Sequence, residues 1–117
     1  MGGLLGALKA LADESRLKIL WILEERALCV CEIQAVLGLA QSTVSRHLQV
    51  LEEAGYVVSE RAGPWKNYRL ASAPPPVVQA LTAQARLAAT GLREARRLRR
   101  LAAQVCREEL CAGKPAA

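Results

Sequence analysis

A mainly α-helical fold with one small β-hairpin is predicted for this chain by three observations. Its 117 residues suffice for one small domain, so we expect residues 1–117 to form a single folded unit. Hydrophobic residues make up 52% of the chain. Most of them are Leu and Ala and none is Phe, which favours packed helices over sheet. Residues 56–71 combine two β-tolerant runs with a Gly-Pro turn between them, which is the pattern of a hairpin.

Helical spacing of apolar residues occurs in four stretches ahead of the hairpin. They are residues 4–11, 14–23, 32–37 and 41–54. Asp13 can cap the second helix, while Gly38 and Gly55 can end the third and fourth. The segment 27–31 is short, apolar and β-tolerant, so we expect strand structure there before the third helix.

The last part of the chain predicts one long helix. The prolines at 74–76 can open it, since proline is tolerated in a first turn. From Val78 to Ala95 the apolar residues alternate steps of three and four, which is typical of a helix that packs along a partner. We expect residues 74–111 to form a dimerisation helix with a thiol-bearing tail. Five arginines are expected on its solvated face: Arg93, Arg96, Arg97, Arg99 and Arg100. The alternative is that they help to draw the dimer toward DNA from a distance.

Charge and apolar content limit the environment of the chain. The net charge of +5 suggests an anionic partner, but the basic excess is C-terminal and does not locate a binding site. The longest apolar stretch, around residues 19–23, is too short to span a bilayer, and no signal-peptide pattern precedes it. We therefore expect a cytoplasmic protein that has no membrane partner. Thiols stay reduced there, which favours ligand or redox roles for four cysteines: Cys29, Cys31, Cys106 and Cys111.

The order of the predicted elements indicates a DNA-binding motif. A short helix, a tight turn at 38–40, a helix that starts with small polar residues and a basic hairpin together make a winged helix-turn-helix. In such a unit the start of the second helix meets base edges in the major groove, where short hydroxyls permit close approach. The expected DNA-contacting residues are Gln41, Ser42, Thr43, Ser45, Arg46 and His47, with Arg61 and Lys66 at the hairpin. A generic helical bundle remains the alternative, as does a structural role for His47.

Three segments of the sequence resemble the arsenical-resistance operon repressor (ArsR) family of bacterial metalloregulators. They are Leu28-Cys-Val-Cys-Glu-Ile, Leu37-Gly-Leu-Ala-Gln-Ser-Thr-Val-Ser-Arg-His-Leu and Leu51-Glu-Glu-Ala-Gly. The resemblance implies a homodimeric repressor of double-stranded operator DNA, not an enzyme, with the dimer formed by the first and last helices. It also implies that DNA binding needs no cofactor and ends when an inducer binds. Ala40 departs from the family, which usually has a capping serine there, so we expect the cap to move to Ser42.

The Cys29 and Cys31 pair is the candidate inducer site. On an ideal helix side chains two residues apart point about 200° from each other, so a shared ion requires a strand or an unwound first turn. A helix that begins at Glu32 would lower the pKa of Cys31 and supply a thiolate. In family members that sense arsenite or antimonite this Cys-Val-Cys pair binds the inducer, often with a third cysteine nearby. This sequence has no cysteine at the matching place, around Gln34.

Trivalent arsenic prefers three thiolates, so we expect Cys106, Cys111 or both to complete the site. As(III) is the expected inducer and Sb(III) is an alternative, while a four-thiolate set would suit Cd(II), Pb(II) or zinc. Binding would shift the recognition helices of the two protomers out of register with successive major grooves. A redox switch that joins Cys29 to Cys31 or to a tail cysteine is the second hypothesis. Inert buried thiols, and exposed cysteines in the tail, remain the structural alternatives.

Overall fold

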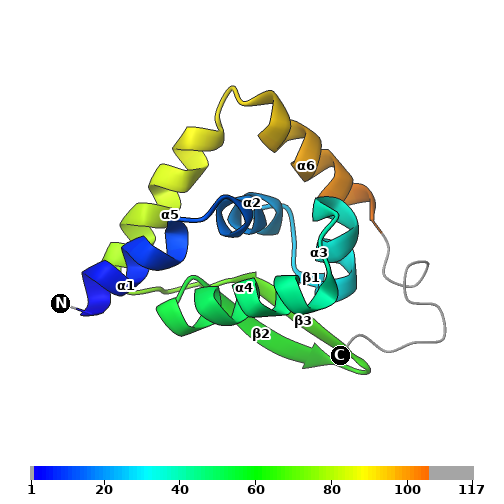
Figure 1. Cartoon of the computed structure of the whole chain (residues 1–117), viewed down its shortest axis with the longest axis horizontal. Coiled ribbons are helices and arrows are strands. Elements are labelled where there is room, and N and C mark those ends of the chain that lie inside the picture. Colours follow the sequence, from blue (N-terminus) through cyan, green and yellow to red (C-terminus); the bar gives the residue numbers. More distant parts are fainter. Residues whose placement is uncertain (1, 106–117) are drawn as a thin grey trace.

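The computed structural model describes residues 2–105, which form six helices and a small three-stranded sheet. In chain order the elements are α1 (Gly2–Leu11), α2 (Glu14–Leu23), β1 (Leu28–Cys29), α3 (Val30–Leu37), α4 (Gln41–Ala54), β2 (Val57–Ala62), β3 (Trp65–Leu70), α5 (Pro76–Ala89) and α6 (Arg93–Gln104). Figure 1 shows α5 and α6 as two sides of a triangle around α2, with α4 and the β2–β3 hairpin along the third side. The mainly helical prediction with one hairpin is confirmed.

The α2 helix forms the centre of the core, as its apolar pattern predicts. All five of its last residues, 19–23, are buried. Its indole at Trp21 remains hydrogen-bonded because Nε1 donates to the carbonyl oxygen of Ala85 on α5, at 2.9 Å. At the other end, the extended residue Asp13 accepts the backbone N–H of Arg16 at 3.0 Å, which confirms the predicted cap.

The α3 and α4 helices make the helix-turn-helix. Gly38 ends α3 in the left-handed region at φ +71°, a conformation that glycine adopts without steric cost. The α4 helix buries a stripe formed by Val44, Leu48 and Leu51. It begins at Gln41 after the extended residue Ala40, which has no capping side chain. The expected move of the cap to Ser42 is therefore wrong.

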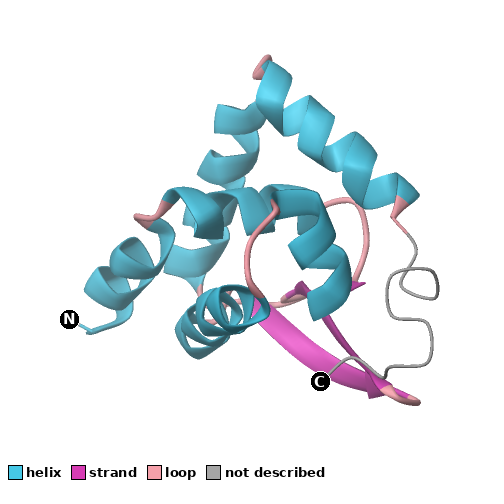
Figure 2. Ribbon diagram, turned by 45° about the vertical axis from the view of Figure 1, so that its right-hand side comes forward, coloured by secondary structure: helices cyan, strands magenta, loops and turns pink. Residues whose placement is uncertain are grey.

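The sheet has the strand order β1-β3-β2, with both pairings antiparallel. The two-residue strand β1 pairs Cys29 with Asn67 of β3, so the predicted strand structure ahead of α3 is confirmed. This pairing attaches the start of the helix-turn-helix to the hairpin. Figure 2 shows the β2–β3 ribbon extending away from the helices to a free tip.

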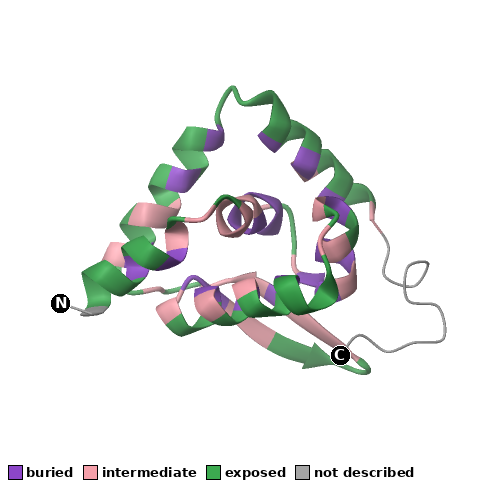
Figure 3. Ribbon diagram, in the orientation of Figure 1, coloured by how far each residue is buried: buried purple, intermediate pink, exposed green. Residues whose placement is uncertain are grey.

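The predicted long C-terminal helix is wrong, because the chain forms two helices with a break at residues 90–92. The Thr90 hydroxyl donates to the carbonyl oxygen of Arg86 at 3.5 Å, and Gly91 takes φ +84°. This Thr-Gly sequence therefore ends α5 as a C-terminal cap ends a helix. The α6 helix then folds back over the core and buries Ala95, Leu98 and Ala102. In Figure 3 the buried parts of α5 and α6 face α2 and their green parts face outward.

None of the helices within residues 2–105 is both long and apolar enough to cross a lipid bilayer. Cys106 and Cys111 lie outside the described residues.

Candidate DNA-binding surface and thiol site

The polar residues predicted on α4 lie outside its buried stripe. Five of them are exposed: Gln41, Ser42, Thr43, Ser45 and Arg46. His47 is half-buried because it faces the start of α2, which is the neighbouring element. No acidic residue stands in the first turn of α4, so this end of the helix keeps its positive dipole field toward solvent. The surface can therefore approach an anionic partner closely.

The hairpin adds two cations near its tip. Arg61 and Lys66 are cross-strand partners one step from the closing pair of the turn. Arg61 is exposed, and the Lys66 ammonium lies 5.5 Å from the ring centroid of Tyr68, which holds its stem against the strand. Arg69, further from the tip, instead pairs with Glu60 at 2.6 Å. The hairpin thus provides a second cationic surface, formed by Arg61 and Lys66, apart from the exposed polar residues of α4.

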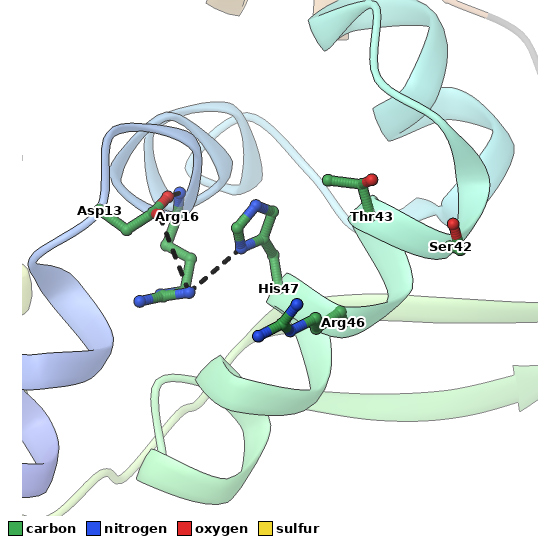
Figure 4. Close-up of a pocket in the computed structure, with 6 residues that line it drawn as sticks. All are labelled: Asp13, Arg16, Ser42, Thr43, Arg46 and His47. Atoms are coloured by element: carbon green, nitrogen blue, oxygen red, sulfur yellow. Dashed lines mark hydrogen bonds and ion pairs between the residues drawn. The ribbon is translucent and has the colours of Figure 1, made fainter.

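A cavity of about 600 Å³ separates the start of α2 from α4 (Figure 4). Its lining residues are Asp13, Arg16, Ser42, Thr43, Arg46 and His47. Within it the Arg16 guanidinium reaches across to the His47 ring, with 3.2 Å between Nη1 and Nδ1. The predicted role of His47 did not include this contact, since α2 and α4 are distant in the sequence.

Cys29 is buried at the junction between β1 and α3. Its backbone is extended, with φ −89° and ψ 169°, and the helix begins at the next residue, Val30. The prediction that α3 begins at Glu32 is therefore wrong by two residues. Burial raises the pKa of the Cys29 thiol above its ordinary value of 9.0, and the backbone N–H of Glu32 offsets only part of the increase. Cys29 consequently rests as a neutral thiol.

Cys31 lies in the first turn of α3 and is half-buried. The pair thus stands across a strand-helix junction, with Cys29 extended and Cys31 helical, and neither of the two expected backbone arrangements is present. Cys29 is a free thiol, whereas Cys31 is disulfide-bonded. A direct Cys29–Cys31 disulfide, one form of the redox hypothesis, is therefore not formed in this structure.

Glu32 and Arg26 fix this junction, and neither was predicted from the sequence. The Glu32 side chain is almost completely buried, and Oε1 accepts the backbone N–H of Cys29 at 2.9 Å. Its other oxygen accepts from Arg26 Nη2 at 3.1 Å, and the same nitrogen donates to the carbonyl oxygen of Val105 at 2.5 Å. The sequence did contain a signal for Glu32: a glutamate three residues after the N-cap residue, here Cys29, is typical of a capping box. Arg26 thus joins the C-terminal end of α6 to the thiol segment.

The described residues contain no group of three His, Cys, Asp or Glu side chains able to hold a metal ion. A three-thiolate site built on Cys29 and Cys31 would therefore require Cys106 or Cys111, outside residues 2–105.

Comparisons with known proteins agree with this geometry. Residues 13–59 match the family described as "Bacterial regulatory protein, arsR family". Similar curated proteins include the "Arsenic resistance transcriptional regulator ArsR1" of Pseudomonas putida, 45% identical over 62% of this chain and 58% of the relative. The "Arsenical resistance operon repressor" of Escherichia coli is 44% identical over 53% of this chain and 54% of the relative. The chain thus spans little more than half the length of these two relatives.

Two solved structures share most of the fold. Reduced HlyU from Vibrio cholerae superposes with a TM-score of 0.62 at 34% identity, over 74% of this chain and 88% of the other. Mb0332 from Mycobacterium bovis, described as a homodimeric winged helix-turn-helix DNA-binding domain and a possible ArsR-family regulator, gives 0.64 at 31% identity, over 78% and 82%.

A helix-turn-helix followed by a basic hairpin and packed on a helical core defines a DNA-binding transcriptional regulator of the winged-helix class. The chain belongs to the ArsR family, whose members are DNA-binding repressors and not enzymes.

Proposed function

We propose that this chain represses transcription as a homodimer bound to operator DNA, and that it releases the DNA when trivalent arsenic binds its cysteine thiolates. Cys29 and Cys31 would supply two sulfurs, and Cys106 or Cys111 the third. The observation that carries the proposal is the position of the Cys29–Cys31 pair at the strand-helix junction where the helix-turn-helix begins. Relatives named for arsenic resistance support the choice of inducer.

In this proposal α4 is the recognition helix. Gln41, Ser42, Thr43, Ser45 and Arg46 would face base edges, His47 would donate to the backbone, and Arg61 and Lys66 would meet phosphates beside the hairpin. Short hydroxyl side chains near the start of α4 permit the close approach that base contacts need. Arg46 is long enough to reach a guanine or a phosphate.

The dimer would form through α1 together with α5 and α6. Support comes from the homodimeric Mb0332 structure and from three exposed leucines on α1, at positions 4, 5 and 8. Leu87 on α5 is also exposed, at 65%. Burying such side chains between protomers would stabilise the dimer by about 25 cal/mol per Å² of apolar surface. Two recognition helices held this way could read half-sites one helical turn apart, about 34 Å.

Arsenic binding would disturb the DNA-bound dimer, because Cys29 is extended and Cys31 is helical, so the backbone must change before both sulfurs can bind one ion. Cys29 would have to leave a buried position and lose its proton, whose pKa burial has raised. The first turn of α3 would then be distorted, and α3 packs directly on α4 through the core. A coupling free energy of about 1–3 kcal/mol would lower operator affinity by about 5- to 150-fold.

The test uses an operator selected from a random duplex pool with the reduced protein. Arsenite is titrated into the complex, in the presence of a phosphine reductant, for the wild type and for Cys29→Ser and Cys31→Ser. Release by arsenite in the wild type and its loss in both variants are expected. Retained release in both variants would refute the site.

A tail variant with both Cys106→Ser and Cys111→Ser serves as the matched comparison, since it keeps the Cys29–Cys31 pair. It is expected to bind arsenic with two sulfurs, whereas the wild type binds with three, as counted by arsenic X-ray absorption. Two sulfurs in the wild type would exclude the tail from the site, and none would exclude the site altogether.

A thiol-redox repressor is the second candidate, and the disulfide at Cys31 favours it. The similarity to a HlyU structure solved in a reduced form is a further reason to consider it. Under this hypothesis two thiols lose two electrons and two protons to an oxidant and form a disulfide, and the distorted α3 releases DNA. Diamide, which takes up those electrons and protons as it becomes the hydrazine, would then release the operator in the absence of arsenite. Arsenite with reductant would have no effect.

A further inference from the structure

The Arg16 side chain joins three elements of the fold. Its Nε donates to the carbonyl oxygen of Ala10 at 2.6 Å and its Nη2 to that of Lys9 at 3.3 Å, both at the end of α1. Its Nη1 lies 3.2 Å from Nδ1 of His47 on α4 and 3.9 Å from a carboxylate oxygen of Asp13. One guanidinium in α2 therefore holds the end of α1 and the middle of α4 in a fixed relation (Figure 4).

This contact sets the tautomer of His47. A guanidinium has only donors, so Nδ1 must accept the hydrogen bond and the proton of the neutral ring must lie on Nε2. His47 lines the same cavity as Ser42, Thr43 and Arg46. The ring thus brings an Nε2–H donor to the α4 side of the cavity, in a single orientation.

The surrounding charges favour this arrangement. Burial raises the pKa of Asp13, but the backbone N–H and the charge of Arg16 outweigh it and hold that pKa below its ordinary value. Asp13 is consequently ionised and balances the guanidinium. The Arg16 side chain is only 17% exposed and its three nitrogens all have protein partners, so it is poorly placed to bind DNA itself. Its role must be exerted through the groups it contacts.

We propose that Arg16 is a positioning residue for DNA binding: it holds His47 as the Nε2–H tautomer and fixes α4 against α1 and α2. The proposal rests on the function proposed above, in which α4 reads the operator and α1 helps to form the dimer. Because Arg16 contacts both α1 and α4, it ties the DNA-reading helix to the dimer-forming helix. The His47 N–H is thereby presented to a phosphate oxygen in both protomers alike.

Arg16→Met tests the proposal, because it keeps a long unbranched side chain and removes the guanidinium N–H donors. Operator affinity is expected to fall about tenfold, in line with the loss of hydrogen bonds from a charged donor. The slope of affinity against salt should not change, because Arg16 itself neutralises no phosphate charge. Arg61→Met is the comparison variant, since a phosphate-contacting cation at the hairpin should flatten that slope by about 0.9. An Arg16→Met slope as flat as that of Arg61→Met would make Arg16 a direct ligand and overturn the proposal.

Nitrogen NMR of the imidazole gives a second readout, and it is unambiguous because the chain has a single histidine. The free wild-type protein should show the Nε2–H tautomer, and Arg16→Met should show a tautomer mixture. An unchanged spectrum together with a loss of affinity would mean a merely structural role. If the wild type binds no operator, the proposed function fails, while the spectrum still decides whether Arg16 sets the tautomer.

Variants of His47 keep the proposal testable if Arg16→Met does not fold. His47→Gln retains a donor near the position of Nε2, whereas His47→Ala removes it. The Gln variant is expected to keep most of the operator affinity and the Ala variant to lose about as much as Arg16→Met. Equal losses for Gln and Ala would overturn the proposal. In a double variant, Arg16→Met should add little to His47→Ala, because both act through one contact.

Discussion

The buried Glu32 carboxylate allows the clearest prediction, because its two partners are fixed. Glu32 is 2% exposed and accepts the backbone N–H of Cys29 at 2.9 Å and the Arg26 guanidinium at 3.1 Å. Glu32→Ala leaves the buried Cys29 N–H without its acceptor, which costs about 1–3 kcal/mol. Loss of the pair with the partly exposed Arg26 adds up to about 1 kcal/mol. The free energy of unfolding should therefore fall by about 1–4 kcal/mol.

Urea unfolding of the reduced protein measures this change. At a slope of about 2 kcal/mol per molar urea, the midpoint for Glu32→Ala should fall by about 0.5–2 M. Glu32→Gln should lose only about 1 kcal/mol, since its amide oxygen can still accept from Cys29. Glu53→Ala, on the exposed face of α4, is the control and should stay within about 0.5 kcal/mol. If Glu32→Ala and Glu32→Gln were both as mild as this control, the carboxylate would not be what holds the junction.

Three further predictions follow from other features. Burial raises the folded-state pKa of Cys29 above its unfolded value, so its contribution to stability should be complete below about pH 9 and fall as the pH rises through the folded pKa. In urea titrations Cys29→Ala should reduce that alkaline loss and leave the part due to Tyr56, whose pKa burial also raises. Gly91→Ala should lower the melting temperature by several degrees, because a residue with a side chain is strained at φ +84°. Gly3→Ala in α1 is the control, since its new methyl group meets open space and should not lower the melting temperature; equal shifts for the two variants would contradict the prediction. Arg61→Ala and Lys66→Ala should each weaken operator binding on every sequence and flatten the salt slope by about 0.9; a loss confined to particular base pairs would instead indicate base reading.

Local signals in the sequence predicted most of the fold. The cap at Asp13 and the glycine ends of α3 and α4 follow from side-chain and backbone chemistry within a few residues. The hairpin follows from its turn residues. These elements were placed correctly because each depends on neighbours in the chain.

The break at Gly91 was missed although its signal was present. Apolar residues keep helical spacing on both sides of the break, so periodicity alone reads through it. The packing of α6 back over α2 also favours two helices, and that packing is tertiary. The same reason explains why α3 begins at Val30, since the pairing of Cys29 with Asn67 holds the residue before it extended.

The candidate site was predictable in its residue types but not in its connections. Gln41 to Arg46 lie on the surface where the helix-turn-helix pattern places them, and the hairpin cations lie near its tip. By contrast, Arg16 meets His47 across 31 positions of sequence, and Arg26 meets Val105 across 79. No local pattern carries such contacts. They depend on how the helices cross.

The turn at residues 90–92 determines which protomer's C-terminal segment lies beside the thiol segment. By reversing the chain, it brings the Val105 carbonyl to Arg26 of the same protomer, beside that protomer's own Cys29 and Cys31. Under the proposed function, a third thiolate that follows Val105 in the sequence would then come from the same protomer as Cys29 and Cys31. In the proposed dimer each protomer would then carry its own inducer ion, so two ions would load one assembly.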